Sequence, residues 1–345
     1  MLPELTRVVF SFGSPCNGQY GHLTLSESGE ILGYHHPNER RWSLLDGELR
    51  FHSESGAITG RFHHCQQSGS WIGHVEGRKW PLSLQPTLSL GSATSSACIF
   101  PPVLVNTIPK SGTYFVEAAL NQVGCPSLRL HLSGNDAVDD YRGMADQEIH
   151  IDPEAVRLYC PLPLVTSILK SEHVVGHIHN QDIIDNIRAQ GVCVLNVIRN
   201  LRDVLVSLYR FKLEKVRPLD ELDKFWRSIP GTSERFLAFL IYSHSRDIQA
   251  IRNIANTMLR DNRGILLRYE ELCTGQISLE AKQKLNQIKD DLDKQLGQAF
   301  RDQYGKPNPT YSGARSHWQD FWSEAAENYF LQTGLEELNQ SLGYS

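Results

Sequence analysis

The chain has 345 residues, 40% of them hydrophobic, and its formal net charge is −5. That length and apolar content suffice for a large core and most simply indicate two domains. The acidic balance argues against broad binding to nucleic acid or anionic membranes, and no apolar run is long enough to span a bilayer. Because the first residues, MLPELTRVVF, lack a charged segment followed by an apolar one, we expect a soluble, cytoplasmic protein.

The seven cysteines are scattered without a CxxC pair, and their number is odd. A disulfide framework is therefore not expected. His63, His64 and Cys65 are consecutive, but adjacent residues of a strand point to opposite faces, and no second ligand pair is spaced to close a site. We therefore predict no metal site.

Residues 1–92 are typical of a small all-β domain. Short alternating runs are separated by turn dipeptides such as Asp46-Gly47, at the regular spacing of a sandwich or a barrel. Its larger aromatic side chains are expected mainly in the core: Tyr34, Trp42, Trp71 and Trp80. The polar stretch 35–42, HHPNERRW, is the best candidate for a contact surface. Residues 88–97, LSLGSATSSA, have the composition of a linker.

Residues 103–124, VLVNTIPKSGTYFVEAALNQVG, are typical of a phosphate-binding strand, loop and helix. An apolar run ends at Pro109, and helical spacing begins at Tyr114 and ends at Gly124. Since the first N–H groups of a helix lack intrahelical acceptors and its dipole is positive there, the loop 110–113 is expected to bind an anion. The expected contacts are the ammonium of Lys110, the hydroxyls of Ser111 and Thr113, and the backbone at Gly112.

The plainer interpretation of this loop is a surface turn, and a second segment argues against it. Arg199 follows a predicted buried strand at 192–198, and Ser207 lies eight residues later on a predicted helix that begins after Asn200. A guanidinium can bind a phosphate through two hydrogen bonds while the hydroxyl adds a third. In the alternative, Arg199 pairs with Asp203 and Ser207 is merely exposed.

The remaining pattern after residue 98 alternates strands with helices. It predicts a three-layer α/β domain with a parallel sheet, whose ligand sites lie beyond the carboxyl ends of the strands. Residues 133–153 are polar, acidic and without periodicity, which is typical of a binding loop or lid. Residues 279–300 predict a single amphipathic helix in a solvated outer layer.

Together, Pro109–Thr113 and Arg199–Ser207 resemble the two nucleotide motifs of the sulfotransferases that use 3′-phosphoadenylyl sulfate (PAPS). The resemblance begins at about Pro101 and implies a P-loop-like sulfotransferase domain over 98–345, with no relative suggested for the β domain. It implies that the loop holds the 5′-phosphosulfate and that Arg199 and Ser207 hold the 3′-phosphate of PAPS or of its product, 3′,5′-ADP. The nucleotide-binding residues that it implies are Lys110, Ser111, Gly112, Thr113, Tyr114, Phe115, Arg199, Ser207, Tyr269, Gly313 and Arg315.

Two of these positions depart from the family pattern. Phe115 falls where the family usually has a Trp that stacks on adenine, which keeps a smaller π-face. The paired basic residues that the family carries before a Gly-Asp-Trp are absent near Gly313, so Arg315 is assigned the missing charge.

The family's base is commonly a histidine in a Gly-His or Lys-x-His sequence before the strand that leads to Arg199. His177, in Val-Gly-His-Ile-His, fits the Gly-His form, and His179 stays open because alternation places both on one face. Lys110 is expected to neutralise the leaving oxygen, so no metal is required.

The acceptor is left open by the sequence: a sugar hydroxyl, a glycolipid, a phenol, or an alcohol or amine of secondary metabolism. Two rival functions remain. One is a P-loop kinase or NTPase, although the GxxxxGK[ST] order is absent. The other is a non-catalytic nucleotide-binding protein whose β domain binds a glycan or a protein. The oligomeric state is open, and we hypothesise that the β domain helps to shape the acceptor site.

Overall fold

The computed structural model describes residues 4–75, 80–92, 100–308 and 318–344. The chain divides into two compact units, and the first comprises Met1–Ala97 with the short segments Asp136–Val138 and Leu158–Lys170. The predicted domains, 1–92 and 98–345, assign those two segments to the second domain. That division into independently folding domains stays a prediction.

The first unit is built on one antiparallel sheet of eight strands, ordered β3-β2-β1-β8-β7-β6-β5-β4. The strands, after a short 3₁₀ turn at Leu5–Arg7, are β1 (Val8–Ser14), β2 (Gly18–Leu25), β3 (Ile31–Leu32), β4 (Arg41–Leu45), β5 (Glu48–His52), β6 (Ile58–Cys65), β7 (Ser70–Val75) and β8 (Leu82–Ser89). The two end strands also meet, because Glu30 forms a bridge with Arg41 and the Ile31 N–H donates to the Arg40 carbonyl at 3.0 Å. The sheet therefore closes into a barrel, one of the two predicted alternatives.

Large side chains fill the barrel, as expected for eight strands. Its core includes Phe10, Phe12, Leu23, Leu49, Phe51, Phe62, Trp71 and Leu84. Tyr34 and Trp42 pack against this core, whereas Trp80 is 40% exposed, so the core prediction is wrong for Trp80. In the predicted contact stretch, Glu39 is fully buried and pairs with His36.

The predicted linker begins too early. Leu88 and Ser89 belong to β8, where they pair with Val9 and Val8 of β1. The small polar composition misled the prediction because a paired strand satisfies its backbone regardless of side-chain size. Residues 93–97 lie outside the described part of the chain.

The second unit contains most of a seven-stranded sheet, ordered β12-β11-β10-β13-β9-β14-β15, although residues 137–138 of β11 and 158–159 of β12 are grouped with the first unit. Its strands are β9 (Val103–Thr107), β10 (Ser127–Ser133), β11 (Ala137–Asp140), β12 (Arg157–Tyr159), β13 (His173–His177), β14 (Cys193–Ile198) and β15 (Ile265–Arg268). The run from β10 to β15 is parallel throughout. All five residues of β9 are buried at its centre. Since the carboxyl ends of these parallel strands share one edge, the loops that follow them meet there.

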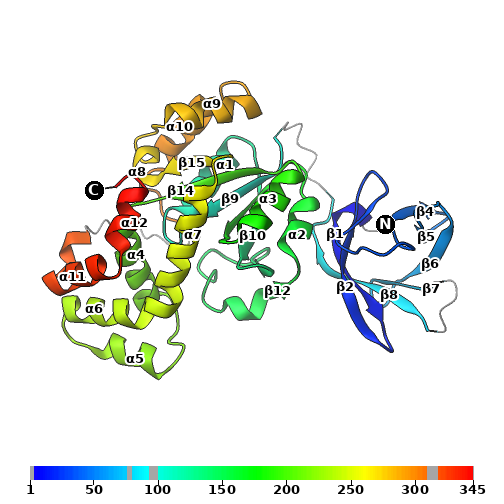
Figure 1. Ribbon diagram of the computed structural model, residues 1–345, viewed down its shortest axis with the longest axis horizontal. Helices are drawn as coiled ribbons and strands as arrows, with labels where there is room; N and C mark the ends of the chain where they lie inside the picture. Colours follow the sequence, from blue (N-terminus) through cyan, green and yellow to red (C-terminus); the bar gives the residue numbers. More distant parts are fainter. Residues whose placement is uncertain (1–3, 76–79, 93–99, 309–317, 345) are drawn as a thin grey trace. The chain divides into compact units, whose positions relative to one another are not determined.

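Helices cover both faces of this sheet (Figure 1). The helices of the second unit are α1 (Thr113–Gln122), α3 (Gln181–Ala189), α4 (Leu201–Glu214), α5 (Glu221–Ser228), α6 (Thr232–Ser243), α7 (Gln249–Arg260), α8 (Tyr269–Leu272), α9 (Leu279–Ile288), α10 (Leu292–Gln303), α11 (Glu324–Gln332) and α12 (Leu335–Ser341), whereas α2 (Leu162–Ser167) belongs to the first unit. One core joins the sheet to α1, α9 and α10, and another joins it to α4, α6, α7, α11 and α12. The prediction of an α/β fold with parallel strands is confirmed, and apolar cores with helices lie on both sides of the sheet.

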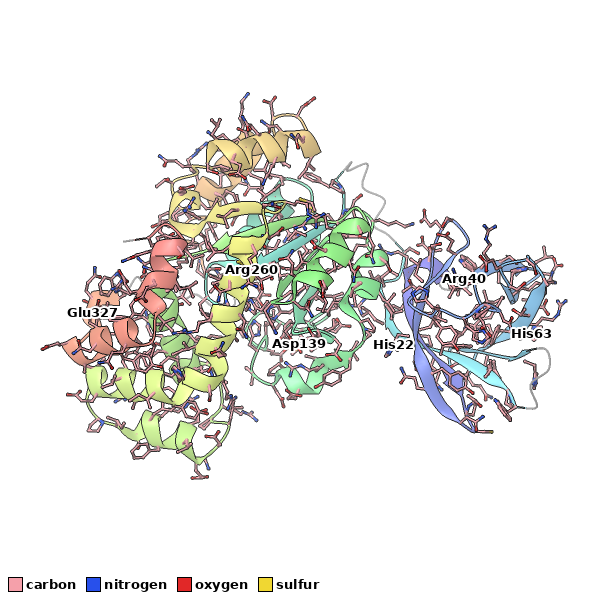
Figure 2. The ribbon with its side chains drawn as sticks, in the orientation of Figure 1. His22, Arg40, His63, Asp139, Arg260 and Glu327 are labelled. Atoms are coloured by element: carbon pink, nitrogen blue, oxygen red, sulfur yellow. The ribbon has the colours of Figure 1, made fainter. Side chains whose placement is uncertain are left out.

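Segments distant in sequence meet in the second core. In Figure 1 the red C-terminal helices lie beside the green helices α4 and α6. Arg202 of α4 donates from Nη2 to the Glu327 carboxylate of α11 at 2.7 Å, and Glu327 is labelled in Figure 2. Arg202 is buried, whereas Glu327 is partly exposed. This pair, with Nη1 of Arg202 also 3.0 Å from Glu336, fixes the C-terminal helices against α4.

Two sequence predictions in this unit are wrong. The helix predicted at 279–300 is two helices, because Asp291 adopts a left-handed conformation (φ 57°) that ends regular winding between them. The second of these, α10, is no solvated layer, since it packs apolar residues against α1. The stretch 133–153 is not wholly a loop, because it contains β11, which pairs at the sheet margin without apolar alternation. Its role as a binding loop or lid stays a prediction.

Candidate functional site

The predicted anion loop lies between the end of β9 and the start of α1 (Thr113–Gln122), at the shared edge of the parallel strands. Lys110 and Gly112 both have positive φ, 70° and 99°. A Cβ on Gly112 would lie 2.5 Å from the Tyr269 ring, so only glycine fits there. The turn leaves the N-terminus of α1 uncapped by a side chain, with its first N–H groups directed out of the helix.

Lys110 holds a positive charge in an apolar setting. Its Nζ is buried without a hydrogen-bond partner in the described chain, and it lies 4.0 Å from the centre of the Phe211 ring. Burial, with repulsion from Arg199, lowers the pKa of Lys110 to about 7. A buried ammonium with no acceptor is costly unless an anion binds it.

Arg199 follows β14 and faces the same space. Its Nη1 donates to the Lys110 carbonyl at 3.3 Å, and its guanidinium lies 4.6 Å from the centre of the Tyr269 ring. The ion pair with Asp203 that the plainer interpretation expected is present but loose, at 3.5 Å from Nη2. The Nε–H is buried and unpaired within the described residues, which leaves Arg199 a donor to offer.

These groups line one cavity of about 320 Å³, which we call the Lys110 cavity. The predicted site residues in its wall are Lys110, Gly112, Thr113, Tyr114, Phe115, His177, Arg199, Ser207 and Tyr269. Lys212 and Asp247, which form an ion pair with each other, also line it. Segments 110–115, 177, 199–207 and 269 thus meet although they are far apart in the chain. Gly313 and Arg315 lie outside the described residues.

The predicted role of the Ser111 hydroxyl is wrong. Ser111 is fully buried, and its Oγ lies 2.7 Å from the Ile108 carbonyl and 2.9 Å from the Val197 carbonyl. Its N–H also donates to the Ile108 carbonyl, at 3.0 Å. Ser111 therefore fixes the turn to β14 and does not line the cavity. The sequence could not show the second of these bonds, since Val197 belongs to β14 and is distant in sequence.

His177 ends β13 and presents one ring nitrogen as a base. Its Nδ1 lies 2.7 Å from the Thr107 carbonyl, and a carbonyl only accepts, so Nδ1 carries the proton and Nε2 has the free lone pair. Burial lowers the pKa of His177 to about 4, which keeps it neutral at pH 7. His179, the alternative, lies outside this wall, where its carbonyl accepts from the Thr257 hydroxyl at 2.7 Å.

Sequence reasoning missed two further histidines of the cavity wall, His131 and His150. The His131 ring, on β10, lies 4.6 Å from the His177 ring. His150 is bonded by Tyr114 at Nε2 (2.5 Å) and by Tyr141 at Nδ1 (3.0 Å). Burial lowers the pKa of both, that of His150 to about 3 with help from Lys110. The carboxyl-end rule would have pointed to His131, since it precedes the end of a predicted strand.

The two predicted adenine contacts have different surroundings. Phe115 is 7% exposed, and its ring lies 5.4 Å from Phe300, so most of it belongs to the core. Tyr269 meets Phe115 edge to face at 5.7 Å and carries the Arg199 guanidinium over one face. A planar ligand would therefore meet Phe115 only at its cavity side.

A search of solved structures finds a likeness to the crystal structure of mouse sulfotransferase SULT7A1 complexed with PAP. The two chains are 11% identical with a TM-score of 0.43, over 72% of this chain and 89% of the other. No family model matches the sequence, and no curated protein matches it. The functional interpretation therefore depends on the residues of this chain.

No group of three or more His, Cys, Asp or Glu side chains in 4–75, 80–92, 100–308 and 318–344 is placed to bind a metal ion. Over those same ranges, no helix is both long enough and apolar enough to cross a bilayer. Six cysteines in these ranges are free thiols: Cys16, Cys65, Cys125, Cys160, Cys193 and Cys273.

Proposed function

We propose that residues 98–345 form a PAPS-dependent sulfotransferase that transfers the sulfuryl group to a hydroxyl or amine of a small-molecule or carbohydrate acceptor. The observation that carries the proposal is the meeting of Lys110 and Arg199 on one cavity, each with a buried N–H group that lacks a partner within the described residues. Two separate cationic donors beside a helix N-terminus suit a ligand with two phosphate groups.

The nucleotide contacts follow from this arrangement. Lys110 and the first N–H groups of α1 would bind the 5′-phosphosulfate, with the Thr113 hydroxyl beside them, 2.7 Å from the Thr107 hydroxyl. Arg199 and Ser207 would bind the 3′-phosphate. Tyr269 would bound the adenine together with the exposed side of Phe115. Gly313 and Arg315 keep their proposed nucleotide roles.

His177 would supply the base for transfer. As the acceptor oxygen forms its bond to sulfur, the acceptor proton passes to Nε2 of His177, and the bond from sulfur to the bridging oxygen breaks. That oxygen leaves with 3′,5′-ADP, and Lys110 stabilises its developing charge. Lys110 supplies the positive charge, so the proposed reaction uses no metal. We keep a cytoplasmic location as part of this proposal.

Nucleotide titrations test this proposal. The protein is expected to bind 3′,5′-ADP at least tenfold more tightly than 5′-AMP, because only 3′,5′-ADP reaches Arg199 and Ser207, and more tightly than ATP with magnesium. Tighter binding of ATP with magnesium would favour a kinase or NTPase instead. Tight binding of 3′,5′-ADP without sulfated product from any acceptor would favour a non-catalytic protein.

A further inference from the structure

A second cavity, of about 360 Å³, adjoins the Lys110 cavity. Tyr114, His131 and Asn308 line both cavities. We call the second one the Glu117 chamber, and the rest of its wall comes from α1, β10 and residues 141–149, with Val175 and Pro307. Because the two cavities share part of a wall, a molecule in the chamber lies next to whatever the Lys110 cavity holds. Its volume is within the range of small-molecule sites.

The chamber wall combines polar and charged side chains with apolar and aromatic ones. Glu117 accepts a hydrogen bond from the Ser127 hydroxyl, and Arg129 donates to Asp146 at 3.0 Å. Asn121 accepts from the Ser127 N–H at 2.8 Å, which leaves its amide N–H₂ for a ligand. Carboxylate, amide and guanidinium groups at close spacing match the hydroxyls of a polyol.

The charge of the chamber excludes some acceptors. It holds Glu117 and Asp146 against Arg129, an excess of one acid, whereas the Lys110 cavity has an excess of basic groups. An acceptor that already carries phosphate or sulfate would be repelled. Asp146 is already paired with Arg129, and Glu117 already accepts from Ser127, so neither carboxylate lacks a partner that a cation would supply.

His131 stands at the shared wall with an unused ring nitrogen. Its Nε2 is buried and has no hydrogen-bond partner among the residues that the structure describes. Burial, the main cause, holds the pKa of His131 well below its ordinary value, so the ring is neutral at pH 7. A hydroxyl that extends from the chamber toward Lys110 would pass this nitrogen and would satisfy it.

We propose that the Glu117 chamber binds the acceptor, and that the acceptor is an uncharged polyhydroxylated molecule such as a sugar or a cyclitol. Glu117 and Arg129 fix its hydroxyls, and the reactive hydroxyl extends past His131 into the Lys110 cavity. This inference rests on the proposed sulfotransferase function. It adds the place and the chemical class of the acceptor.

Ligand-observed NMR tests it on the full-length protein, with and without saturating 3′,5′-ADP. The probes are myo-inositol, glucose and N-acetylglucosamine as polyols, 2-naphthol as an apolar phenol, and tyramine as a cation. At least one polyol is expected to bind, and Glu117→Ala and Arg129→Asn are each expected to weaken it at least tenfold. Asn tolerates the left-handed backbone of Arg129 (φ 54°), so this variant keeps the fold. Glu280→Ala, at a position 77% exposed on α9, is the control and should leave polyol binding unchanged.

The outcomes separate this inference from the proposed function. If 2-naphthol or tyramine binds and none of the polyols does, the polyol class of acceptor is overturned. The same holds if none of the probes binds. Polyol binding that both variants leave unchanged would overturn the place. The 3′,5′-ADP affinity of the variants should stay within twofold of wild type. If polyols bind in the chamber but 3′,5′-ADP does not bind at all, polyol binding by the chamber is supported and the sulfotransferase proposal fails.

Discussion

The charge of Lys110 gives the sharpest test of the site, because it titrates near neutral pH. The pKa of Lys110 is about 7 in the free protein, against an ordinary value near 10.5. Bound 3′,5′-ADP would keep the Lys110 ammonium charged, so the protein's affinity for 3′,5′-ADP is highest below pH 7 and falls as pH rises. The two histidines near Lys110 do not titrate above pH 7, since the pKa of His150 is about 3 and that of His177 is about 4.

The expected magnitude follows from the fraction of Lys110 that is charged. Between pH 7.5 and 9 that fraction falls about 25-fold, so the Kd for 3′,5′-ADP should rise by about 25-fold, or about 1.9 kcal/mol. The ligand phosphates are fully ionised over this range, because their second pKa is near 6. Calorimetric titrations at pH 7.5, 8, 8.5 and 9 measure the slope directly.

Matched variants assign the slope to Lys110. Lys110→Met should bind more weakly at pH 7.5 and lose the pH dependence. Lys294→Met, at a position 77% exposed on α10, should keep all of it. A flat Kd in the wild-type protein, or a full slope in Lys110→Met, would refute both the lowered pKa and the place of Lys110 in the anion site.

Other predictions concern the second phosphate, the base and stability. Arg199→Gln should erase most of the preference for 3′,5′-ADP over 5′-AMP, a loss of about 1.5–3 kcal/mol in binding free energy measured by calorimetry. The control Arg210→Gln, on α4, should keep this preference. A retained preference in Arg199→Gln would contradict the 3′-phosphate assignment. His177→Asn should lower kcat at least 100-fold in a sulfated-product assay without changing the 3′,5′-ADP Kd, and His179→Asn should be fully active; the reverse result would move the base to His179. Burial lowers the pKa of His173 and His177 to about 4 in the folded state, so the unfolded chain takes up protons first as pH falls through 6.5. Each of the two histidines should therefore lower the free energy of unfolding by about 2 kcal/mol between pH 7 and 5, measured by urea denaturation. The variant His177→Asn should lose only the contribution of His173 over this range. An unchanged pH dependence in that variant would argue against burial of a neutral His177 imidazole.

The hypothesis that the β domain shapes the acceptor site stays a prediction. Every lining residue of the Lys110 cavity and of the Glu117 chamber belongs to the second unit. A role for the barrel in acceptor binding would therefore act on a chamber that the second unit already forms. Replacing exposed barrel residues such as Arg40 and comparing acceptor KM values would measure any such contribution.

Local sequence determined the strands and helices that carry the proposed nucleotide-binding residues. The apolar runs at β9 and β14 are long enough to be buried strands, and Gly124 ends α1 with a φ of 89°, as a residue without Cβ can. Asn200 caps α4 by accepting from the Arg202 N–H at 2.9 Å. These features depend on contacts within a few residues, which a sequence pattern encodes directly.

Tertiary structure decided what those elements do together. The Ser111 hydroxyl is bonded to carbonyls at the ends of neighbouring strands, and no local pattern reveals that acceptors from β14 lie above it. His131 reached the site because β10 pairs with β13 beside His177, and the chamber formed because Glu117 and Arg129 face each other from a helix and a strand. The same holds for the barrel, in which β1 pairs with β8 from the other end of the unit's sequence. Side-chain partners separated by tens of residues depend on strand order and register, which are set by the whole fold and not by any one segment.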